Sequence, residues 1–396
     1  MHIGLRIVFA ALLLGVSTSA PAQSVFGARI SVRFDAHHIG KITASGYADP
    51  FTKRALSADD PVRIASVSKL AVALGVMRLV EAGTLDLDQD VSKRLGWTLR
   101  NPAFPDTPIT LRLLLSHQSS ITDGIDYALP LGASLRTALA DPAAWDATHR
   151  PGHWFHYSNL NFPVIASVME AASSERFDRL MARLVFIPLK LDACFNWTTC
   201  SDKAVARAVV LTDGEGKVRR DRFDGKRPAC PVVPRADGSC DLSSYVPGGN
   251  GALFSPQGGM RISARDLAKI GQMLVKQGHG FLSRRSIVEM TKPAWRYDGS
   301  NGETEGGFFC SYGLAIQTLA NNRSECRDDP LGDGRKRIGH PGEAYGLRSG
   351  LWFDPASGKG AAFFVTAVPD EAPKGRSSFT EAEEVQLQDL RDPLHK

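Results

Sequence analysis

The chain has 396 residues, of which 43% are hydrophobic and 22% are charged. These fractions exclude a disordered chain, and 37 glycines with 23 prolines are too few for a low-complexity or collagen-like one. The net charge of +5 is small beside 47 basic and 42 acidic residues, and a nucleic-acid-binding surface needs clustered Lys and Arg, so we expect no nucleic-acid partner. The length suits two lobes or one large catalytic unit.

Residues 1–22 have the pattern of a cleavable secretory signal peptide. Arg6 gives a positive start, and residues 7–16 form an apolar run that is too short to cross a bilayer. Ala20-Pro21-Ala22 then fits a small-x-small cleavage site, and the alternative is an uncleaved anchor. We therefore expect a periplasmic or secreted protein with no stable membrane insertion.

Six cysteines in an exported chain indicate disulfides, and six cysteines allow 15 pairings. We predict the sequential pairing because each pair then closes a short polar loop. The absence of CxxC spacing argues against zinc or redox chemistry. The predicted pairs are Cys194–Cys200, Cys230–Cys240 and Cys310–Cys326.

The apolar pattern predicts the elements in chain order. Strands are expected at 29–34 and 41–47, followed by helices at 65–83, where Gly83 gives a stop, 109–115 and 162–172. Residues 194–259, rich in Gly, Pro, Asp and Arg, are expected to be loops held by disulfides. Ser263 and Asp266 predict a capping-box helix over 263–277, and strands follow at 312–316, 347–353 and 361–368. Thr380 and Glu383 predict the cap of a last short helix.

This order predicts an α+β fold in which N- and C-terminal strands form one antiparallel sheet flanked by helices. A mainly helical lobe, about 97–260, is then inserted into a domain over 23–372. Residues 373–396 are expected to form a tail or a short helix.

The segment Ser66-Val67-Ser68-Lys69 places a serine and a lysine one helical turn apart on one face. A desolvated amine has a lowered pKa and can take the hydroxyl proton, while free N–H groups at a helix start can hold an oxyanion. A chance Ser-x-x-Lys is the alternative, but no other serine here has a lysine three residues later.

Tyr157-Ser158-Asn159 precedes one of the predicted helices. A tyrosine hydroxyl is a poor base at its usual pKa of about 10, but beside a cationic lysine it can ionise or shuttle a proton. Asn159 is suited to orient that lysine and to hold a substrate carbonyl. The alternative is an Asn helix cap beside an ordinary aromatic side chain.

Gly339-His340-Pro341-Gly342 comes just before a predicted strand. The glycines allow backbone to approach a ligand closely, and His340 is suited to donate a hydrogen bond or a proton. The alternative is a turn with a surface histidine. His149, His153 and His156 are interpreted as ordinary loop histidines rather than metal ligands, because Pro151-Gly152 interrupts any helical spacing.

Together these motifs resemble the penicillin-binding-protein and β-lactamase serine hydrolases, the branch that includes class C β-lactamases, DD-peptidases, D-aminopeptidases and lipase-like (family VIII) esterases. The resemblance spans roughly residues 40–369. The segments that carry it are 63–70, 79–88, 110–117, 251–255 and 339–342.

The resemblance implies that Ser66 is the acylated nucleophile and that Lys69 activates it. Tyr157 is then the general base in acylation and the acid for the leaving group, and Asn159 positions Lys69 and the substrate. The backbone N–H groups of Ser66 and Glu343 would form the oxyanion hole. His340 stands where many relatives have the Lys of a Lys-Thr-Gly motif.

That last position departs from the β-lactamase pattern. His340 is mostly neutral at pH 7 with an ordinary pKa, Pro341 has no hydroxyl, and Glu343 adds a negative charge. These changes weaken recognition of a substrate carboxylate, for which Arg348 is the candidate compensating cation, and Gly342 is expected to lie against the substrate. We therefore favour an uncharged ester or amide.

The alternatives are a D-amino-acid peptidase or DD-carboxypeptidase, a class C-like β-lactamase, and a non-catalytic binding module of the same fold. The sequence has no Gly-x-Ser-x-Gly, phosphate loop or dinucleotide fingerprint, so no cofactor or metal is expected. The partner is expected to be a small ester, amide or D-peptide. The pocket walls are expected from 128–150 and 194–249, by analogy with the family.

Overall fold

The computed structural model describes residues 27–391. The predicted signal peptide at 1–22 lies outside these residues, and the domain division at 23–372 and 373–396 stays a prediction. Within the described residues, no helix combines the length and the apolar character that crossing a membrane requires.

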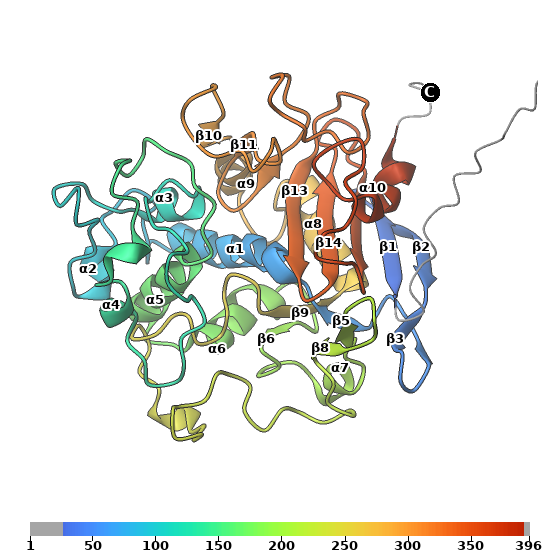
Figure 1. The fold of residues 1–396 in the computed structure, drawn as a ribbon, viewed down its shortest axis with the longest axis horizontal. Helices are drawn as coiled ribbons and strands as arrows, with labels where there is room; N and C mark the ends of the chain where they lie inside the picture. The colour runs from blue at the N-terminus through green and yellow to red at the C-terminus, as the bar shows by residue number, and fades with distance from the viewer. Residues whose placement is uncertain (1–26, 392–396) are drawn as a thin grey trace, which may run out of the picture.

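An eight-stranded antiparallel sheet forms the frame of the molecule (Figure 1). Its order is β10-β11-β12-β13-β14-β15-β1-β2, so the N-terminal hairpin lies directly beside the last strand. This confirms the predicted sheet of N- and C-terminal strands. The strands are β1 (Arg29–Phe34), β2 (Ile39–Ser45), β10 (Trp295–Arg296), β11 (Ser311–Tyr312), β12 (Gln317–Thr318), β13 (Ile338–Ala344), β14 (Leu347–Phe353) and β15 (Gly360–Val365).

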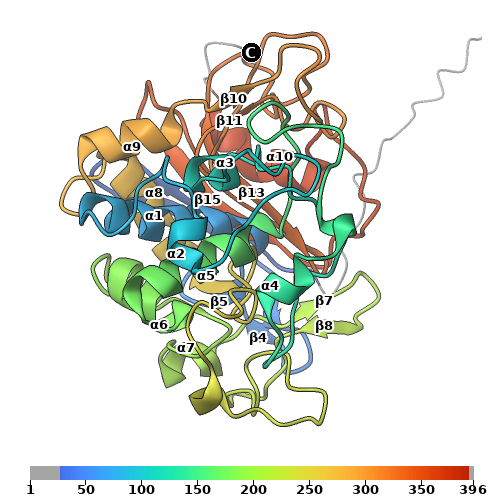
Figure 2. The same cartoon turned by 90° about the vertical axis from the view of Figure 1, so that its left-hand side faces the viewer.

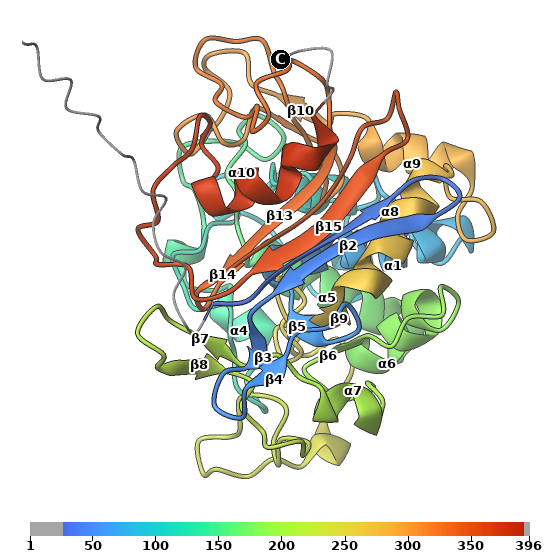
Figure 3. The ribbon, with the colours of Figure 1, turned by 90° about the vertical axis from the view of Figure 1, so that its right-hand side faces the viewer.

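Helices cover both faces of this sheet, as Figure 3 shows with α10 (Glu381–Leu387) in front and α8 (Ala264–Val275) behind. Alternate side chains of β14 therefore enter two different cores. Leu351 and Phe353 join the large core under α8, whereas Trp352 joins a smaller core with Phe379 and Leu387 of the α10 side. Burial on both faces explains why these strands read as almost continuous apolar runs.

The central helix α1 (Ser68–Glu81) lies between the sheet and a group of shorter helices (Figures 1 and 2). The remaining helices are α2 (Ser92–Leu95), α3 (Leu111–Leu115), α4 (Leu135–Ala138), α5 (Asn161–Ser173), α6 (Phe177–Met181), α7 (Asp202–Ala206) and α9 (Arg284–Thr291), with the short turns η1 (Ala65–Val67), η2 (Pro142–Ala144), η3 (Ala182–Phe186), η4 (Leu242–Ser244) and η5 (Gln388–Leu390).

Three small sheets complete the fold and support the segment that precedes α1. Strand β9 (Met260–Ser263) is the centre of the three-stranded one, between β5 (Pro61–Arg63) and β6 (Cys194–Phe195). The other two are the pairs β3 (Tyr47–Asp49) with β4 (Arg54–Ala55), and β7 (Leu211–Thr212) with β8 (Val218–Arg220).

One predicted strand assignment is wrong near the far edge of the sheet. The expected strand at 312–316 is a tight hairpin between β11 and β12, in which Gly313 N–H donates to the Ile316 carbonyl. A Cβ on Gly313 would lie 2.3 Å from the Met290 carbonyl oxygen, so this turn depends on α9. Residues 339–342 do come before the predicted strand at 347–353, which is β14, but they lie within β13, a strand that the sequence analysis did not predict.

The structure confirms one predicted capping box in full and another only in part. The Thr380 side chain and the Glu383 carboxylate form the full capping box of α10. At α8, Ser263 accepts from the Asp266 N–H, but the Asp266 carboxylate accepts from the Asp192 N–H at 2.9 Å. The predicted capping box of α8 therefore has only its serine half, because Asp266 ties the helix to the segment before β6.

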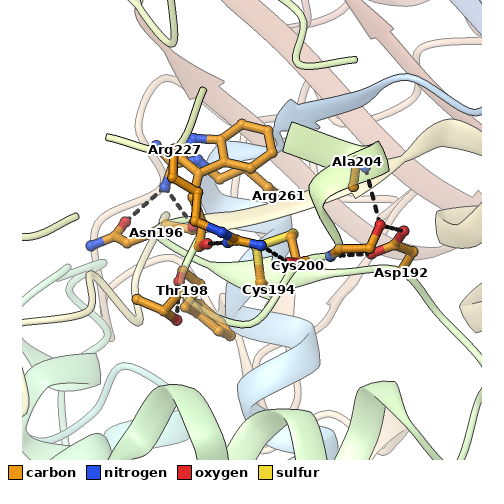
Figure 4. Close-up of a disulfide and its surroundings, with 12 residues drawn as sticks. Asp192, Cys194, Asn196, Thr198, Cys200, Ala204, Arg227 and Arg261 are labelled. Carbon is orange, nitrogen blue, oxygen red and sulfur yellow. Dashed lines mark hydrogen bonds between the residues drawn. A yellow bond between two sulfur atoms is a disulfide. The ribbon is translucent and has the colours of Figure 1, made fainter. Parts of the chain in front are cut away.

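The three disulfides join the cysteines in sequential pairs, as predicted. Figure 4 shows Cys194–Cys200 with Arg227 and Arg261 beside it. Arg227 donates to the carbonyl oxygens of Trp197 and Cys200, so the loop closed by this disulfide is also fastened from outside.

Candidate active site

Ser66 stands in η1, at the point where β5 turns into α1. Ala65 just before it has φ of +51°, a left-handed conformation that a non-glycine residue rarely adopts. Strand β13 runs alongside this turn. A Cβ on Gly342 would lie 2.5 Å from the Ile64 carbonyl oxygen and 3.3 Å from the Ser66 nitrogen, so only glycine lets β13 come this close to the nucleophile.

The Lys69 ammonium group has three acceptors around it. Its Nζ donates to Ser66 Oγ at 3.0 Å, to Asn159 Oδ1 at 2.8 Å and to the Gln257 carbonyl oxygen at 2.9 Å. The residue has no exposed surface, and burial lowers the pKa of Lys69 to about 7, although Asp123 and Glu305 act in the opposite direction. Near neutral pH, a substantial fraction of this amine is therefore free to accept a proton.

Asp123 organises the Tyr157-Ser158-Asn159 loop, and the sequence analysis missed it. Its carboxylate accepts from the side chains of Ser158 and Asn159 and from the backbone N–H groups of Asn159 and Leu160, all within 2.8–3.0 Å. Because the Asn159 amide donates to Asp123, its oxygen is turned toward Lys69. The predicted orienting role of Asn159 thus depends on a carboxylate 36 residues earlier.

Tyr157 lies between two rings and beside the lysine. It stacks on Phe309 with ring centroids 4.7 Å apart and on His117 at 4.3 Å. Lys69 Nζ is 4.9 Å from the Tyr157 ring centre. Burial raises the pKa of Tyr157 well above its usual value, and its hydrogen bond with Ser66 only partly offsets this. Tyr157 is therefore a neutral phenol at neutral pH, which is suited to donate or relay a proton.

His340 is close to this cluster but does not line the cavity beside it. The side chain is fully buried, and its Nδ1 lies 2.6 Å from the Pro341 carbonyl oxygen, which can only accept. The proton is therefore on Nδ1, and Nε2 accepts from the Tyr312 hydroxyl at 2.7 Å. Burial lowers the pKa of His340 to about 3, so the ring stays neutral. This geometry disagrees with direct donation from His340 to a substrate.

Glu343 lies near the opposite end of β13, and Arg348 lies across from it on β14. Glu343 is exposed, and its carboxylate is 2.7 Å from the guanidinium of Arg348, whose side chain is 5% exposed. Arg348 therefore already has a negative partner. It lines the cavity together with Gly342 and Glu343, but it does not present an unpaired cation there.

A cavity of about 720 Å³ opens over Ser66, Tyr157 and Asn159. The predicted segment 194–249 supplies much of the wall, whereas 128–150 contributes only Ala128. Phe308 and Phe309 form a further wall that the sequence analysis did not anticipate.

Two of the three histidines considered as metal ligands have side-chain partners in the protein. His149 contacts Asp146 and stacks on Trp154, and His156 lies 2.9 Å from Glu303. Among residues 27–391, no group of three or more His, Cys, Asp or Glu side chains has an arrangement suited to hold a metal ion.

Comparison with known proteins identifies the family of the chain. A family model described as Beta-lactamase matches residues 26–383. The chain belongs to the beta-lactamase family. Within the family, it is 30% identical to the esterase EstB of Burkholderia gladioli over 287 residues, which cover 66% of this chain and 68% of EstB.

The chain is also similar to a penicillin-binding protein in sequence and to an amidase in structure. Penicillin-binding protein 4* of Bacillus subtilis is 27% identical over 150 residues, which cover 36% of this chain and only 32% of that protein. The solved structure of the D-amino acid amidase from Ochrobactrum anthropi SV3 has a TM-score of 0.64 at 20% identity and covers 93% of this chain and 94% of the amidase. This structural likeness confirms the fold.

Proposed function

We propose that this beta-lactamase family member is an exported serine hydrolase that cleaves a small ester or amide through an acyl-enzyme on Ser66, with esters preferred. The observation that carries the proposal is the 3.0 Å contact between Lys69 Nζ and Ser66 Oγ at the floor of the cavity. Its support also includes the lowered pKa of Lys69, since an amine with a pKa of about 7 accepts a proton near neutral pH.

In the proposed acylation step, neutral Lys69 takes the Ser66 hydroxyl proton while Oγ bonds to the substrate carbonyl carbon. The carbonyl oxygen becomes an oxyanion that accepts from the N–H groups of Ser66 and Glu343. Tyr157 donates its proton to the leaving group as the bond to that group breaks, and Lys69 returns a proton to Tyr157. Water then attacks the acyl-enzyme by the same route, which releases the acid and restores Ser66.

This assignment changes the part expected for Tyr157. The family resemblance makes Tyr157 the base in acylation, but burial raises its pKa and lowers that of Lys69. Lys69 is then the stronger candidate for the base, and Tyr157 for the acid and proton relay.

We expect esters to be preferred over D-peptides and β-lactams, which carry a carboxylate. The residues near the position where relatives hold that carboxylate offer no free positive charge here. His340 is neutral and buried there, and Arg348 already pairs with Glu343. The alignment with EstB over two thirds of both chains supports the same choice. Hydrolysis of D-amino-acid amides or peptides remains the second candidate, since the amidase shares the fold over nearly its whole length.

Intact-mass measurement after a fluorophosphonate probe tests the proposed chemistry. We expect one adduct on the wild-type protein and none on Ser66→Ala. No adduct on a properly folded wild-type protein would favour a binding module.

A short-chain chromogenic ester, a D-alanyl dipeptide and a chromogenic cephalosporin then separate the substrate classes. Turnover of the cephalosporin alone would overturn the esterase preference. Export is supported by the three disulfides and by the predicted signal peptide, and secretion of a tagged full-length chain tests it.

A further inference from the structure

One wall of the cavity carries more positive charge than the protein itself neutralises. Six arginines line the cavity, and four of them have a carboxylate partner: Arg219 with Asp213, Arg222 with Asp224, Arg261 with Asp221 and Arg348 with Glu343. Within residues 27–391, the other two, Arg63 and Arg220, form no ion pair with a carboxylate. These two guanidinium groups therefore have no carboxylate within ion-pair distance, although Asp221 stabilises the charge of Arg63 from farther away.

Arg63 is the more unusual of the two. It is half-buried on β5, and its Nε is shielded from solvent with no hydrogen-bond partner in the described chain. Burial and the neighbouring Arg261 lower the pKa of Arg63 to about 10. Removing a cation from water without a partner costs free energy, so such a group is stabilised when an anion arrives.

Tyr345 joins the two guanidinium groups into one cluster. Arg63 lies 5.2 Å and Arg220 4.6 Å from the centre of the Tyr345 ring, and Arg220 also donates to the Tyr345 hydroxyl at 3.1 Å. Tyr345 has φ of +56° in the two-residue turn between β13 and β14, where Asn or Gly is usual. Burial alone would raise the pKa of Tyr345, but Arg63 and Arg220 outweigh it and lower the pKa.

The position of this cluster assigns it to one side of the scissile bond. Strand β13 runs from the neighbourhood of β11 toward β5 and β8 (Figure 1). Ser66 lies beside this strand at Gly342. Tyr157, which must reach the leaving group, stacks on Phe309 near the β11 end. Arg63 on β5 and Tyr345 directly after β13 lie toward the other end, where the acyl part of a substrate bound in this direction would extend.

We propose that Arg63, Arg220 and Tyr345 form a subsite for a carboxylate on the acyl part of the substrate. This inference rests on the proposed acyl-transfer function and names its substrate class as esters or amides of short dicarboxylic acids. It agrees with the weak recognition of a carboxylate at the His340 end, because the two groups lie on opposite sides of Ser66. A planar guanidinium binds a carboxylate through two parallel hydrogen bonds, and a second guanidinium adds charge.

Two esters of equal chain length test the subsite: the mono-4-nitrophenyl ester of glutaric acid and 4-nitrophenyl valerate. We expect the wild-type enzyme to prefer the glutarate ester by about tenfold or more in kcat/KM, and added salt to reduce that preference. The preference should fall by about tenfold in Arg63→Met. It should fall by a smaller factor in Arg220→Met, because Arg220 is exposed to solvent. Equal kcat/KM for the two esters, or an unchanged ratio in both variants, would overturn the subsite.

Arg219→Met is the matched control, because Arg219 lies on the same strand and already pairs with Asp213. It removes the same net charge and should change the ratio by less than about twofold. A fall as large as that of Arg220→Met would mean that general charge, rather than this cluster, selects the ester.

Calorimetric binding of glutarate to Ser66→Ala separates the two proposals. Binding that is lost in Ser66→Ala/Arg63→Met supports the subsite even if neither ester is hydrolysed, in which case only the proposed function fails. If the valerate ester is hydrolysed and the glutarate ester is not preferred, the proposed function stands and only the subsite fails.

Discussion

The catalytic cluster and the arginine wall handle buried charge in opposite ways. Lys69 has three acceptors within 3.0 Å, whereas the Arg63 side chain has neither a hydrogen bond nor an ion pair within residues 27–391. The first arrangement holds one amine at a fixed distance from Ser66. The second arrangement leaves a cation whose anionic partner has to come from a ligand. The difference teaches that partners supplied by the fold suit proton transfer, while a missing partner suits ligand recognition.

Ser66→Ala should separate the two regions most clearly, because it should abolish catalysis and leave binding at the arginine wall intact. Removing Oγ removes the nucleophile, so kcat/KM on 4-nitrophenyl valerate should fall by about 10⁴-fold or more. Binding of glutarate at the arginine wall should persist. Ser255→Ala, a serine that lines the same cavity, is the control and should keep most of the activity. Comparable loss in both variants would contradict the assignment of Ser66.

Lys69 should govern the pH dependence of the reaction. Below a pH of about 7 Lys69 is an ammonium ion that cannot accept the Ser66 proton, so kcat/KM should rise with pH and level off above an apparent pKa of about 7. Lys69→Met should lose about 10²–10⁴-fold and its profile should lack this rise. Measurement from pH 5 to 9 checks this, with the exposed Lys93→Met as control. A rise that survives in Lys69→Met belongs to another group.

Asp123→Asn tests whether the loop before α5 depends on its carboxylate. The change keeps the size of the side chain but weakens four hydrogen bonds to Ser158, Asn159 and Leu160. We expect kcat to fall by about 10- to 100-fold with a smaller change in KM, because Asn159 then holds Lys69 less firmly. Asp126→Asn, an exposed aspartate of the same loop, should have little effect. A KM-only effect would mean that Asp123 supports binding and not the position of Lys69.

The smallest effect on catalysis is expected from removing the disulfide that lies in the cavity wall. Replacing Cys230 and Cys240 with serine opens a short loop and should cost about 2–3 kcal/mol of stability. The kcat for the valerate ester should change by only about twofold, because neither cysteine contacts the catalytic cluster. Thermal unfolding and kinetics on the purified variant measure both quantities.

The frame of this fold was predictable because local pattern and tertiary role coincide there. The strand at Arg29–Phe34 and the helices after Ser66 and Ser263 follow the apolar period of buried elements. The sequential cysteine pairs were predicted because each closes a short polar loop, and the structure has these pairs. These elements needed no knowledge of their partners.

Other features depend on partners that no local pattern encodes. The turn at Gly313 forms against α9, and Pro341 fits inside β13 because β12 pairs with that strand only at Ile338 and Gly339. Asp123 was not predicted as a site residue because half of its partners are backbone N–H groups, which every non-proline residue has and no sequence motif marks. The buried position of His340 likewise depends on its hydrogen bond with Tyr312. Tyr312 belongs to β11, a strand whose bounds were predicted wrongly from the sequence.

The pairing of β1 with β15 has a consequence for how the molecule is made. The Ala28 N–H donates to the Thr366 hydroxyl across 338 residues, and each disulfide spans at most 16. During synthesis the nucleophile therefore emerges long before the strand that lies against it, and no early crosslink holds its place. We expect folding to be slow, limited by this late closure, and a chain truncated before β13 to have no hydrolytic activity at any stage of its export.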